Sequence, residues 1–166
     1  MPRDVFHVPS PTWVYVLATW FGLGRLPKAP GTWGSLGALP FLLLLYGVSW
    51  PIFAIVICLF FVLGWYCSWV ILPDVDNHDP SFIVIDEVVG VWIMALLIPH
   101  IGWALLLGFI LFRVFDIWKP GPVSWADGLR GGRCIIALGI MLDDVLAALY
   151  SVATLYVIFF LMGQTI

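Results

Sequence analysis

Adjacent carboxylates occur twice inside strongly apolar stretches of the sequence, and they are the first candidates for chemistry. Asp86 and Glu87 follow the apolar run Ile83–Ile85, and Asp143 and Asp144 lie within a second apolar segment. Two neighbouring acids repel each other, so both stay ionised away from water only beside a cation, whether Lys, Arg or metal. The helix dipole accounts for one acid at a helix start but not easily for two. The pattern predicts a site built around a cation.

Two cations, Arg113 and Lys119, lie near the end of an apolar run, within residues 112–122. Arg113, Asp116 and Pro120 share a helical face at three- and four-residue spacing, so an ion pair between Arg113 and Asp116 is one interpretation. The other is an anion site, because a guanidinium group binds two phosphate oxygens at once. For the second acidic pair, the structural alternative to a functional role is neutralisation by Arg113 or Lys119.

A glycine-rich segment at residues 22–35 adds further candidates. It carries two cations and two hydroxyl side chains, Arg25, Lys28, Thr32 and Ser35. Backbone amides at a helix start can bind an anion, and Thr32 or Ser35 is placed to cap such a start. An ordinary turn at a membrane entry explains the segment equally well.

The composition identifies the setting in which these residues act. The 166-residue chain is 63% hydrophobic and 10% charged, with a mean hydropathy of +1.08. Seven basic and ten acidic residues cannot coat a water-soluble protein of this size, so most of the surface must face lipid. The net charge of −3 gives no footprint for nucleic acid, and three cysteines make neither a disulfide framework nor a zinc site.

The apolar runs predict an all-α fold, a polytopic membrane helix bundle formed by a single domain over residues 1–166. Five runs are near the ~20 residues that a spanning helix needs. They cover residues 34–50, 51–72, 82–99, 101–118 and 134–162. The shorter aromatic run at 13–24 predicts an interfacial or re-entrant segment.

The charges predict the orientation of these spans. With the amino terminus in the cytoplasm, all seventeen charged side chains fall on the inner side of the membrane. The positive-inside rule accounts for Lys and Arg but gives Asp and Glu little weight. We therefore expect the carboxylates to form a site at the inner interface.

Four sequence blocks resemble the phosphatidylglycerophosphatase A family across nearly the whole chain. They are FGLGRLPKAPGTWGS (21–35), IVIDEVVGVW (83–92) preceded by His78-Asp79, FRVFDIWKPGP (112–122) and GIMLDDVLA (139–147). The resemblance implies a magnesium-dependent phosphatase of the bacterial cytoplasmic membrane, which converts phosphatidylglycerophosphate to phosphatidylglycerol. In the family the Gly-Gly pair usually lies one residue before the Gly of the last block. Here the six residues Arg133–Leu138 separate Gly131-Gly132 from Gly139, which reads as an insertion of five residues.

This resemblance and the residue chemistry together give the expected site. Oxygen ligands without a His/Cys set favour Mg²⁺. The expected metal ligands, in order, are Glu87, Asp143, Asp86 and Asp144. The expected substrate-binding residues are Arg113, Lys119, Lys28, Arg25, Thr32 and Ser35. The expected catalytic residues are Asp116, Asp79 and Asp143, either by activating water or by an acid acting as nucleophile.

Small residues select between the two aspartates of the second pair. Gly139, Asp143, Ala147 and Ser151 recur every four residues, which marks a packing face and predicts that Asp143 is the deeper ligand. The phospholipid substrate is the expected partner, and no obligatory protein partner is evident. Two alternatives remain, a cation transporter or channel that uses the buried acids and a lipid head-group transferase.

Overall fold

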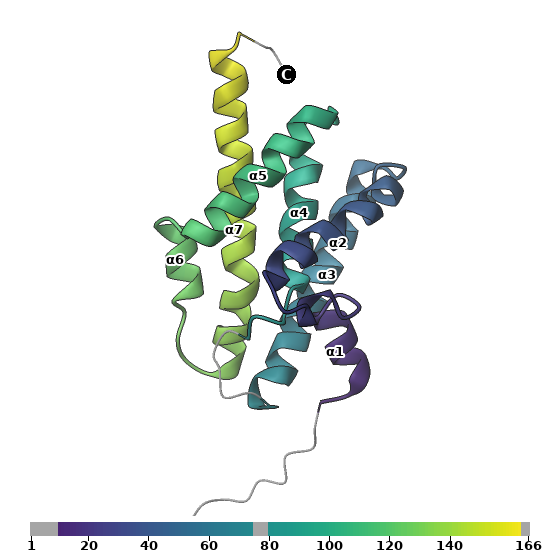
Figure 1. Cartoon of the computed structure of the whole chain (residues 1–166), viewed down its shortest axis with the longest axis vertical. Helices are drawn as coiled ribbons and strands as arrows, with labels where there is room; N and C mark the ends of the chain where they lie inside the picture. The colour runs from purple at the N-terminus through teal and green to yellow at the C-terminus, as the bar shows by residue number, and fades with distance from the viewer. Residues whose placement is uncertain (1–9, 75–79, 164–166) are drawn as a thin grey trace, which may run out of the picture.

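The protein is a helical bundle in the computed structural model, which describes residues 10–74 and 80–163 (Figure 1). Those residues contain helices and no strands. The α-helices are α1 (Thr12–Ala18), α2 (Pro30–Leu45), α3 (Trp50–Ile71), α4 (Ile85–Leu97), α5 (Gly102–Trp118), α6 (Pro122–Asp127) and α7 (Arg133–Leu161). Two short 3₁₀ helices, η1 (Leu23–Arg25) and η2 (Leu72–Asp74), complete the elements. The all-α prediction is confirmed.

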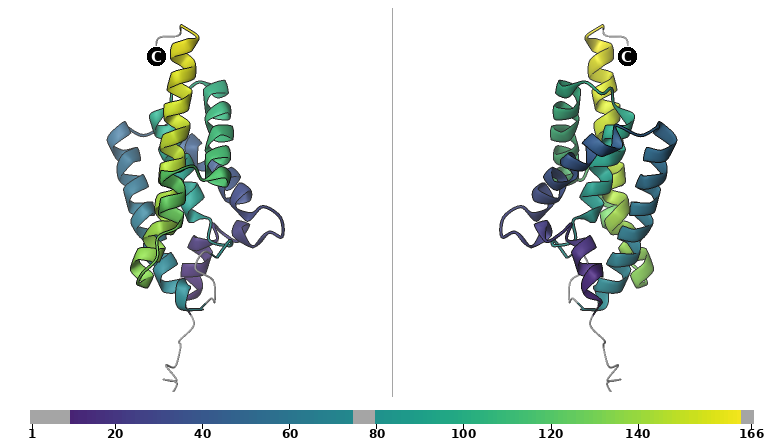
Figure 2. Two further views of the ribbon diagram at one scale, coloured as in Figure 1. Left: turned by 90° about the vertical axis from the view of Figure 1, so that its left-hand side faces the viewer. Right: turned by 90° about the vertical axis from the view of Figure 1, so that its right-hand side faces the viewer.

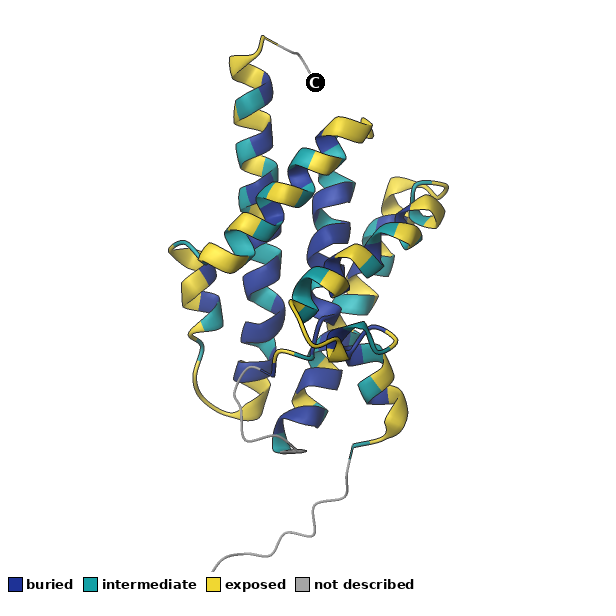
Figure 3. Ribbon diagram, in the orientation of Figure 1, coloured by how far each residue is buried: buried dark blue, intermediate teal, exposed yellow. Residues whose placement is uncertain are grey.

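Helix α4 is the centre of the bundle. It packs against α2, α3, α5 and α7, and most of its residues are buried (Figure 3). A helix that is apolar on all sides favours such a position. Val84 precedes it in a non-helical conformation, and its N–H donates a 2.8 Å hydrogen bond to Ala18 O at the end of α1. This connection sets the start of α4, so that Asp86 and Glu87 lie in its first turn.

Helix α7 is 29 residues long and runs the length of the molecule (Figure 2). It packs against α3, α4, α5 and α6. The residues Arg133–Leu138 belong to this unbroken helix, which begins after the extended residue Gly132. They therefore form the first turns of α7, and the helix is unbroken up to the Asp143-Asp144 pair.

Charged and uncharged connections lie at opposite ends of the bundle. The α2–α3 and α4–α5 connections and the C-terminal end of α7 lie in the upper half of Figure 1, while α1 and the starts of α4 and α7 lie in the lower half. The upper connections, residues 46–49 and 98–101, contain no Asp, Glu, Lys or Arg. This arrangement agrees with the one-sided charge distribution.

Two helices, α3 and α7, are long and apolar enough to cross a membrane. Helices α2, α4 and α5 have 16, 13 and 17 residues, which is shorter than the ~20 of a typical span. The run at 82–99 gives a short helix because the chain is not yet helical at Val84 and leaves the helix at Ile98, directly before Pro99. The expectation of about five spans is therefore not confirmed by helix length.

Candidate active site

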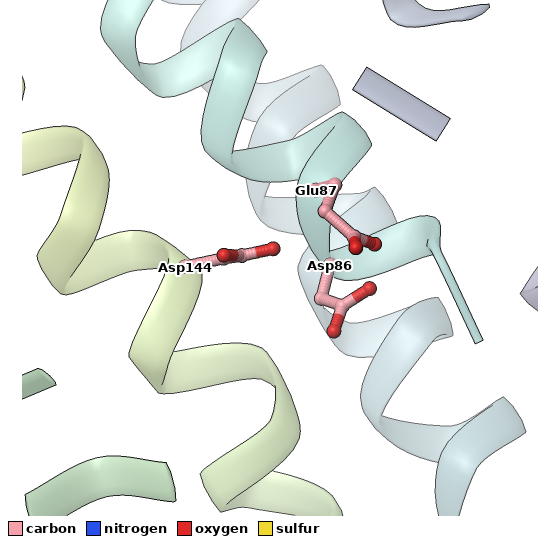
Figure 4. Close-up of side chains that lie close together, drawn as sticks. All are labelled: Asp86, Glu87 and Asp144. Atoms are coloured by element: carbon pink, nitrogen blue, oxygen red, sulfur yellow. The ribbon is translucent and has the colours of Figure 1, made fainter. Parts of the chain in front are cut away.

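Three carboxylates from two helices meet in the lower half of the bundle. Asp86 and Glu87 occupy the first turn of α4, and Asp144 reaches toward them from α7 (Figure 4). One oxygen from each of the three lies within 4.8 Å of the others. The structure thus brings together acids that are nearly sixty residues apart in the sequence.

The cluster has the donor set of a cation site. Asp86 is 9% exposed and Asp144 is 2% exposed. Within the described part of the chain, Glu87 Oε2 and Asp144 Oδ1 are buried and have no hydrogen-bond partner. Buried oxygens without donors are costly, and a divalent cation would neutralise the charges that repel each other here. Donors that are all carboxylate oxygens fit Mg²⁺ better than they fit a softer metal.

Two glycines allow the surrounding chain to approach this cluster. A Cβ atom at Gly31, in the first turn of α2, would overlap Glu87 Oε1 and lie 3.2 Å from Arg113 Nη2. A Cβ atom at Gly90 would lie 3.1 Å from Asp144 O and closer still to the Phe112 ring. The absence of a side chain at Gly90 thus permits a close approach of α5 and α7, and Gly31 has the same effect on the other side.

Arg113 lies beside the carboxylates and is held by two neighbours. Its Nη1 lies 2.6 Å from Asp116 Oδ2 and donates a 3.1 Å hydrogen bond to Ser35 Oγ. Ser35 Oγ in turn donates to Gly31 O over 2.8 Å, which links α5 to the start of α2. The Arg113–Asp116 ion pair is confirmed, and Arg113 Nε has no hydrogen-bond partner among the described residues. Asp116 and Ser35 therefore orient the guanidinium group.

Lys119 is positioned by the end of α5. It follows the last residue of α5 in a left-handed conformation with φ of 48°, and Pro120 and then Pro122, the first residue of α6, come after it. Its Nζ donates to Asp143 Oδ2 over 2.7 Å and also pairs with Asp127 Oδ1. Burial lowers the pKa of Lys119, but the Asp143 and Asp127 carboxylates outweigh this effect and hold the pKa above its usual range.

The prediction that Asp143 lies deeper than Asp144 is wrong. Asp143 is 6% exposed and is engaged by Lys119, whereas Asp144 is 2% exposed and joins Asp86 and Glu87. Both residues lie on the buried side of α7, because α4, α5 and α6 cover a wide arc of that helix. The small-residue face therefore did not separate the two carboxylates.

A cavity of about 320 Å³ connects these groups. Its wall contains the five acids Asp86, Glu87, Asp116, Asp143 and Asp144, the cations Arg113 and Lys119, and residues 29–32 from the start of α2. Thr32 lines it as expected, while Ser35 acts from behind Arg113. Acidic and basic side chains thus line one shared cavity.

Several predictions about site residues are not confirmed by the structure. Arg25 is exposed, stacks over the Tyr15 ring at 5.9 Å and lines a different cavity, and Lys28 is exposed and outside the lining. Neither Thr32 nor Ser35 caps α2, because the helix begins at Pro30 after Ala29 without a side-chain cap. The predicted catalytic residue Asp79 lies outside the described residues.

Sequence reasoning missed two residues that the structure places at the site. Asp127 pairs with Lys119, and Ser81 lines the cavity. A signal for Asp127 was present, because Pro120 and Pro122 predict a turn that would bring α6 back toward the end of α5. Ser81 gave no comparable signal.

Comparisons with known proteins give one consistent result. A family model described as phosphatidylglycerophosphatase A matches residues 16–159. The chain is 38% identical over 146 residues to phosphatidylglycerophosphatase A of Escherichia coli (strain K12), covering 87% of this chain and 82% of the relative. It is 43% identical over 148 residues to the Haemophilus influenzae protein of that name, covering 87% and 88%.

A third relative carries a different name. The chain is 39% identical over 145 residues to a candidate phosphatidylinositol-3-phosphatase of Bacteroides thetaiotaomicron, covering 82% of this chain and 87% of the relative. No solved structure was found to match the chain.

Proposed function

Because the chain belongs to the phosphatidylglycerophosphatase A family and is therefore a phosphatase, we propose that it acts on phosphatidylglycerophosphate in a magnesium-dependent reaction at the inner membrane surface. Water attacks the phosphorus of the terminal monoester, the bond from phosphorus to the glycerol oxygen breaks, and that oxygen takes up a proton. The products are phosphatidylglycerol and inorganic phosphate.

One observation carries this proposal: acidic side chains and cationic side chains line a single cavity. Asp86, Glu87 and Asp144 form the acidic wall, and Arg113 and Lys119 lie with them around the same 320 Å³ space. Phosphate monoesters hydrolyse very slowly without charge neutralisation and positioning. A cavity with a cation site and phosphate-binding cations meets both requirements.

The three clustered carboxylates would hold Mg²⁺, which when bound supplies Lewis-acid neutralisation of phosphate charge. Arg113, which Asp116 and Ser35 hold at the cavity wall, binds phosphate oxygens. Lys119 adds positive charge at the same cavity. Asp116 lines the cavity and orients the attacking water, which makes it the proposed catalytic carboxylate.

The membrane setting supports a lipid substrate. Helices α3 and α7 are proposed spans, and α2, α4 and α5 are proposed shorter spans that complete a bundle of five. The charged residues at one end of the bundle then face the cytoplasm. The lipid tails remain in the bilayer while the head group enters the cavity.

The test is phosphate release by the protein purified in detergent. We expect release from phosphatidylglycerophosphate with Mg²⁺ and none after chelation with EDTA. Phosphatidylinositol 3-phosphate is the comparison substrate, because one relative bears the corresponding name. Preference for that lipid would overturn the substrate assignment, and equal rates with and without Mg²⁺ would overturn the metal assignment. Asp144→Asn is the inactive control.

A further inference from the structure

A second cavity, of about 430 Å³, opens on the outer face of α5. Phe109, Ile110, Arg113, Val114, Ile117 and Trp118 line it, and we call it the α5 groove. Two of these residues, Arg113 and Ile117, also line the carboxylate cavity. The two spaces are therefore neighbours, and the only charged residue of the α5 groove lies at their junction.

The α5 groove continues along the helix as an exposed apolar stripe. Ile110, Val114 and Ile117 follow the spacing of one helical face and are 50%, 48% and 73% exposed. Leu106, one turn further from the carboxylates, is 62% exposed. Exposed bands along α5 are visible in Figure 3. From Leu106 to Ile117 the stripe covers roughly 16 Å at 1.5 Å per residue, which is about half of the ~30 Å hydrocarbon core of a bilayer.

We infer that the α5 groove binds one acyl chain of the phospholipid substrate while the terminal phosphate occupies the carboxylate cavity, an inference that rests on the proposed function. The order of chemistry along the protein matches the order along the lipid. The apolar stripe would contact the tail, Arg113 at the junction would bind a phosphate oxygen, and the acidic cluster lies beyond it. The substrate would thus enter laterally from the membrane along α5.

A larger apolar cavity provides the comparison. It has a volume of about 520 Å³ and is lined by Val62, Trp65, Tyr66 and Trp69 of α3 with Cys134 of α7. None of these residues lines the carboxylate cavity. Val62 is 56% exposed, close to the 48% of Val114. A tryptophan at position 114 therefore fills a groove that adjoins the carboxylate cavity, whereas a tryptophan at position 62 fills a groove that does not.

The experiment compares Val114→Trp with Val62→Trp on two substrates in detergent micelles. One is long-chain phosphatidylglycerophosphate, and the other is its acyl-free head group, glycerophosphoglycerophosphate. We expect Val114→Trp to raise KM for the lipid by about tenfold, the scale of a filled apolar subsite, with kcat nearly unchanged. The acyl-free substrate should show no such increase in KM, and Val62→Trp should change neither reaction.

Each other outcome has a defined meaning. Equal KM values for the two tryptophan variants would overturn the inference and leave the α5 groove as a surface for bulk lipid. Equal losses on both substrates with Val114→Trp would also overturn it, because they indicate a displaced helix. A change in oligomeric mass on light scattering would assign the groove to a second copy of the chain. If the wild-type protein releases phosphate from neither substrate, the proposed function itself fails.

Ile110→Trp makes the test independent of a single variant. Ile110 lies one turn further along the stripe than Val114. Ile110→Trp should therefore raise KM only for substrates whose acyl chains are long enough to reach position 110. Val114→Trp should raise KM for substrates with shorter acyl chains as well. The same chain-length dependence for both variants would contradict a tail that lies along α5.

Discussion

Asp143 and Asp144 are adjacent in the chain, yet their carboxylates belong to different parts of the site. Asp143 Oδ2 lies 2.7 Å from Lys119 Nζ. A carboxylate oxygen of Asp144 instead lies within 4.8 Å of one oxygen each of Asp86 and Glu87. Successive residues on a helix point about 100° apart, since 3.6 residues complete a turn. One acid therefore faces the end of α5 and the other faces α4.

This geometry predicts unequal effects of two matched substitutions. Asp144→Asn should lower Mg²⁺-dependent phosphate release by more than ~100-fold, while Asp143→Asn should cost ~10–100-fold, the usual range for a group that supports a metal site indirectly. Without Mg²⁺, Asp144→Asn should raise the thermal unfolding midpoint because it removes charge repulsion. Mg²⁺ should no longer stabilise that variant. A Mg²⁺-induced thermal shift that is lost in Asp143→Asn and kept in Asp144→Asn would reverse the assignment.

Lys119 predicts a stability effect that a double substitution can isolate. Lys119→Met leaves Asp143 largely buried without its cation and should lower the free energy of unfolding by about 1–3 kcal/mol. Adding Asp143→Asn should recover part of that loss, which denaturant unfolding of the two single variants and the double variant will measure. Strictly additive losses would contradict a direct interaction.

The raised pKa of Lys119 also predicts how this contribution varies with pH. A lysine whose pKa is higher when folded stabilises the protein fully below the unfolded pKa, about 10.4, and loses this effect only at more alkaline pH. Lys119 should therefore stay protonated between pH 6 and 9. Its titration should not reduce the difference in unfolding free energy between the wild type and Lys119→Met in that interval. A fall in that interval that follows the titration of one lysine would contradict the assignment.

Arg113 predicts a loss that charge alone does not rescue. Arg113→Lys keeps the positive charge but removes the geometry that bonds Asp116, Ser35 and a phosphate oxygen together. One charged hydrogen bond is worth about 1.5–3 kcal/mol, so kcat/KM should fall by roughly 10–150-fold. The matched control is Arg130→Lys, because Arg130 is exposed and bonds only backbone oxygens of Asp127 and Leu129 in the described structure. Equal activity of both variants would return Arg113 to a structural role.

Gly31 predicts an effect of a single methyl group on activity. Gly31→Ala places a Cβ atom against Glu87 Oε1, and the flexible end of Glu87 has to move away from the cluster. Activity should fall by at least about tenfold in line with the loss of one supporting group, while the unfolding midpoint changes by only a few degrees. Gly102→Ala is the control, because a Cβ atom there meets nothing within 4 Å. Unchanged Mg²⁺ dependence in Gly31→Ala would contradict the role given to Glu87.

The proposed topology predicts which surfaces are accessible from each side of the membrane. In a variant without the three native cysteines, single cysteines at Val48 and Gly102 should react with an impermeant thiol reagent added outside intact cells. A cysteine in place of the exposed Trp125 in α6 should react only after the cells are opened. Labelling of position 125 from outside would contradict the placement of the charged end in the cytoplasm.

Hydropathy, charge and motif spacing were sufficient to predict the helical class, the two acidic pairs and the Arg113–Asp116 pair. These features are local or compositional. A long apolar run forms a helix wherever it packs, and residues three apart on a helix are neighbours in any tertiary structure. The same reasoning identified the family, because its four blocks are short and occur in order.

Only the tertiary structure decided which groups meet. It placed Asp144 with Asp86 and Glu87, gave Asp143 and Asp127 to Lys119, and left Arg25 outside the cavity. The direction in which a side chain points depends on how each helix is rotated about its axis and on what packs beside it. A one-residue step along a helix turns a carboxylate by about 100°. The acidic pairs could therefore be predicted from the sequence, whereas the packing of α4, α5 and α7 determined that Asp143 and Asp144 contact different groups.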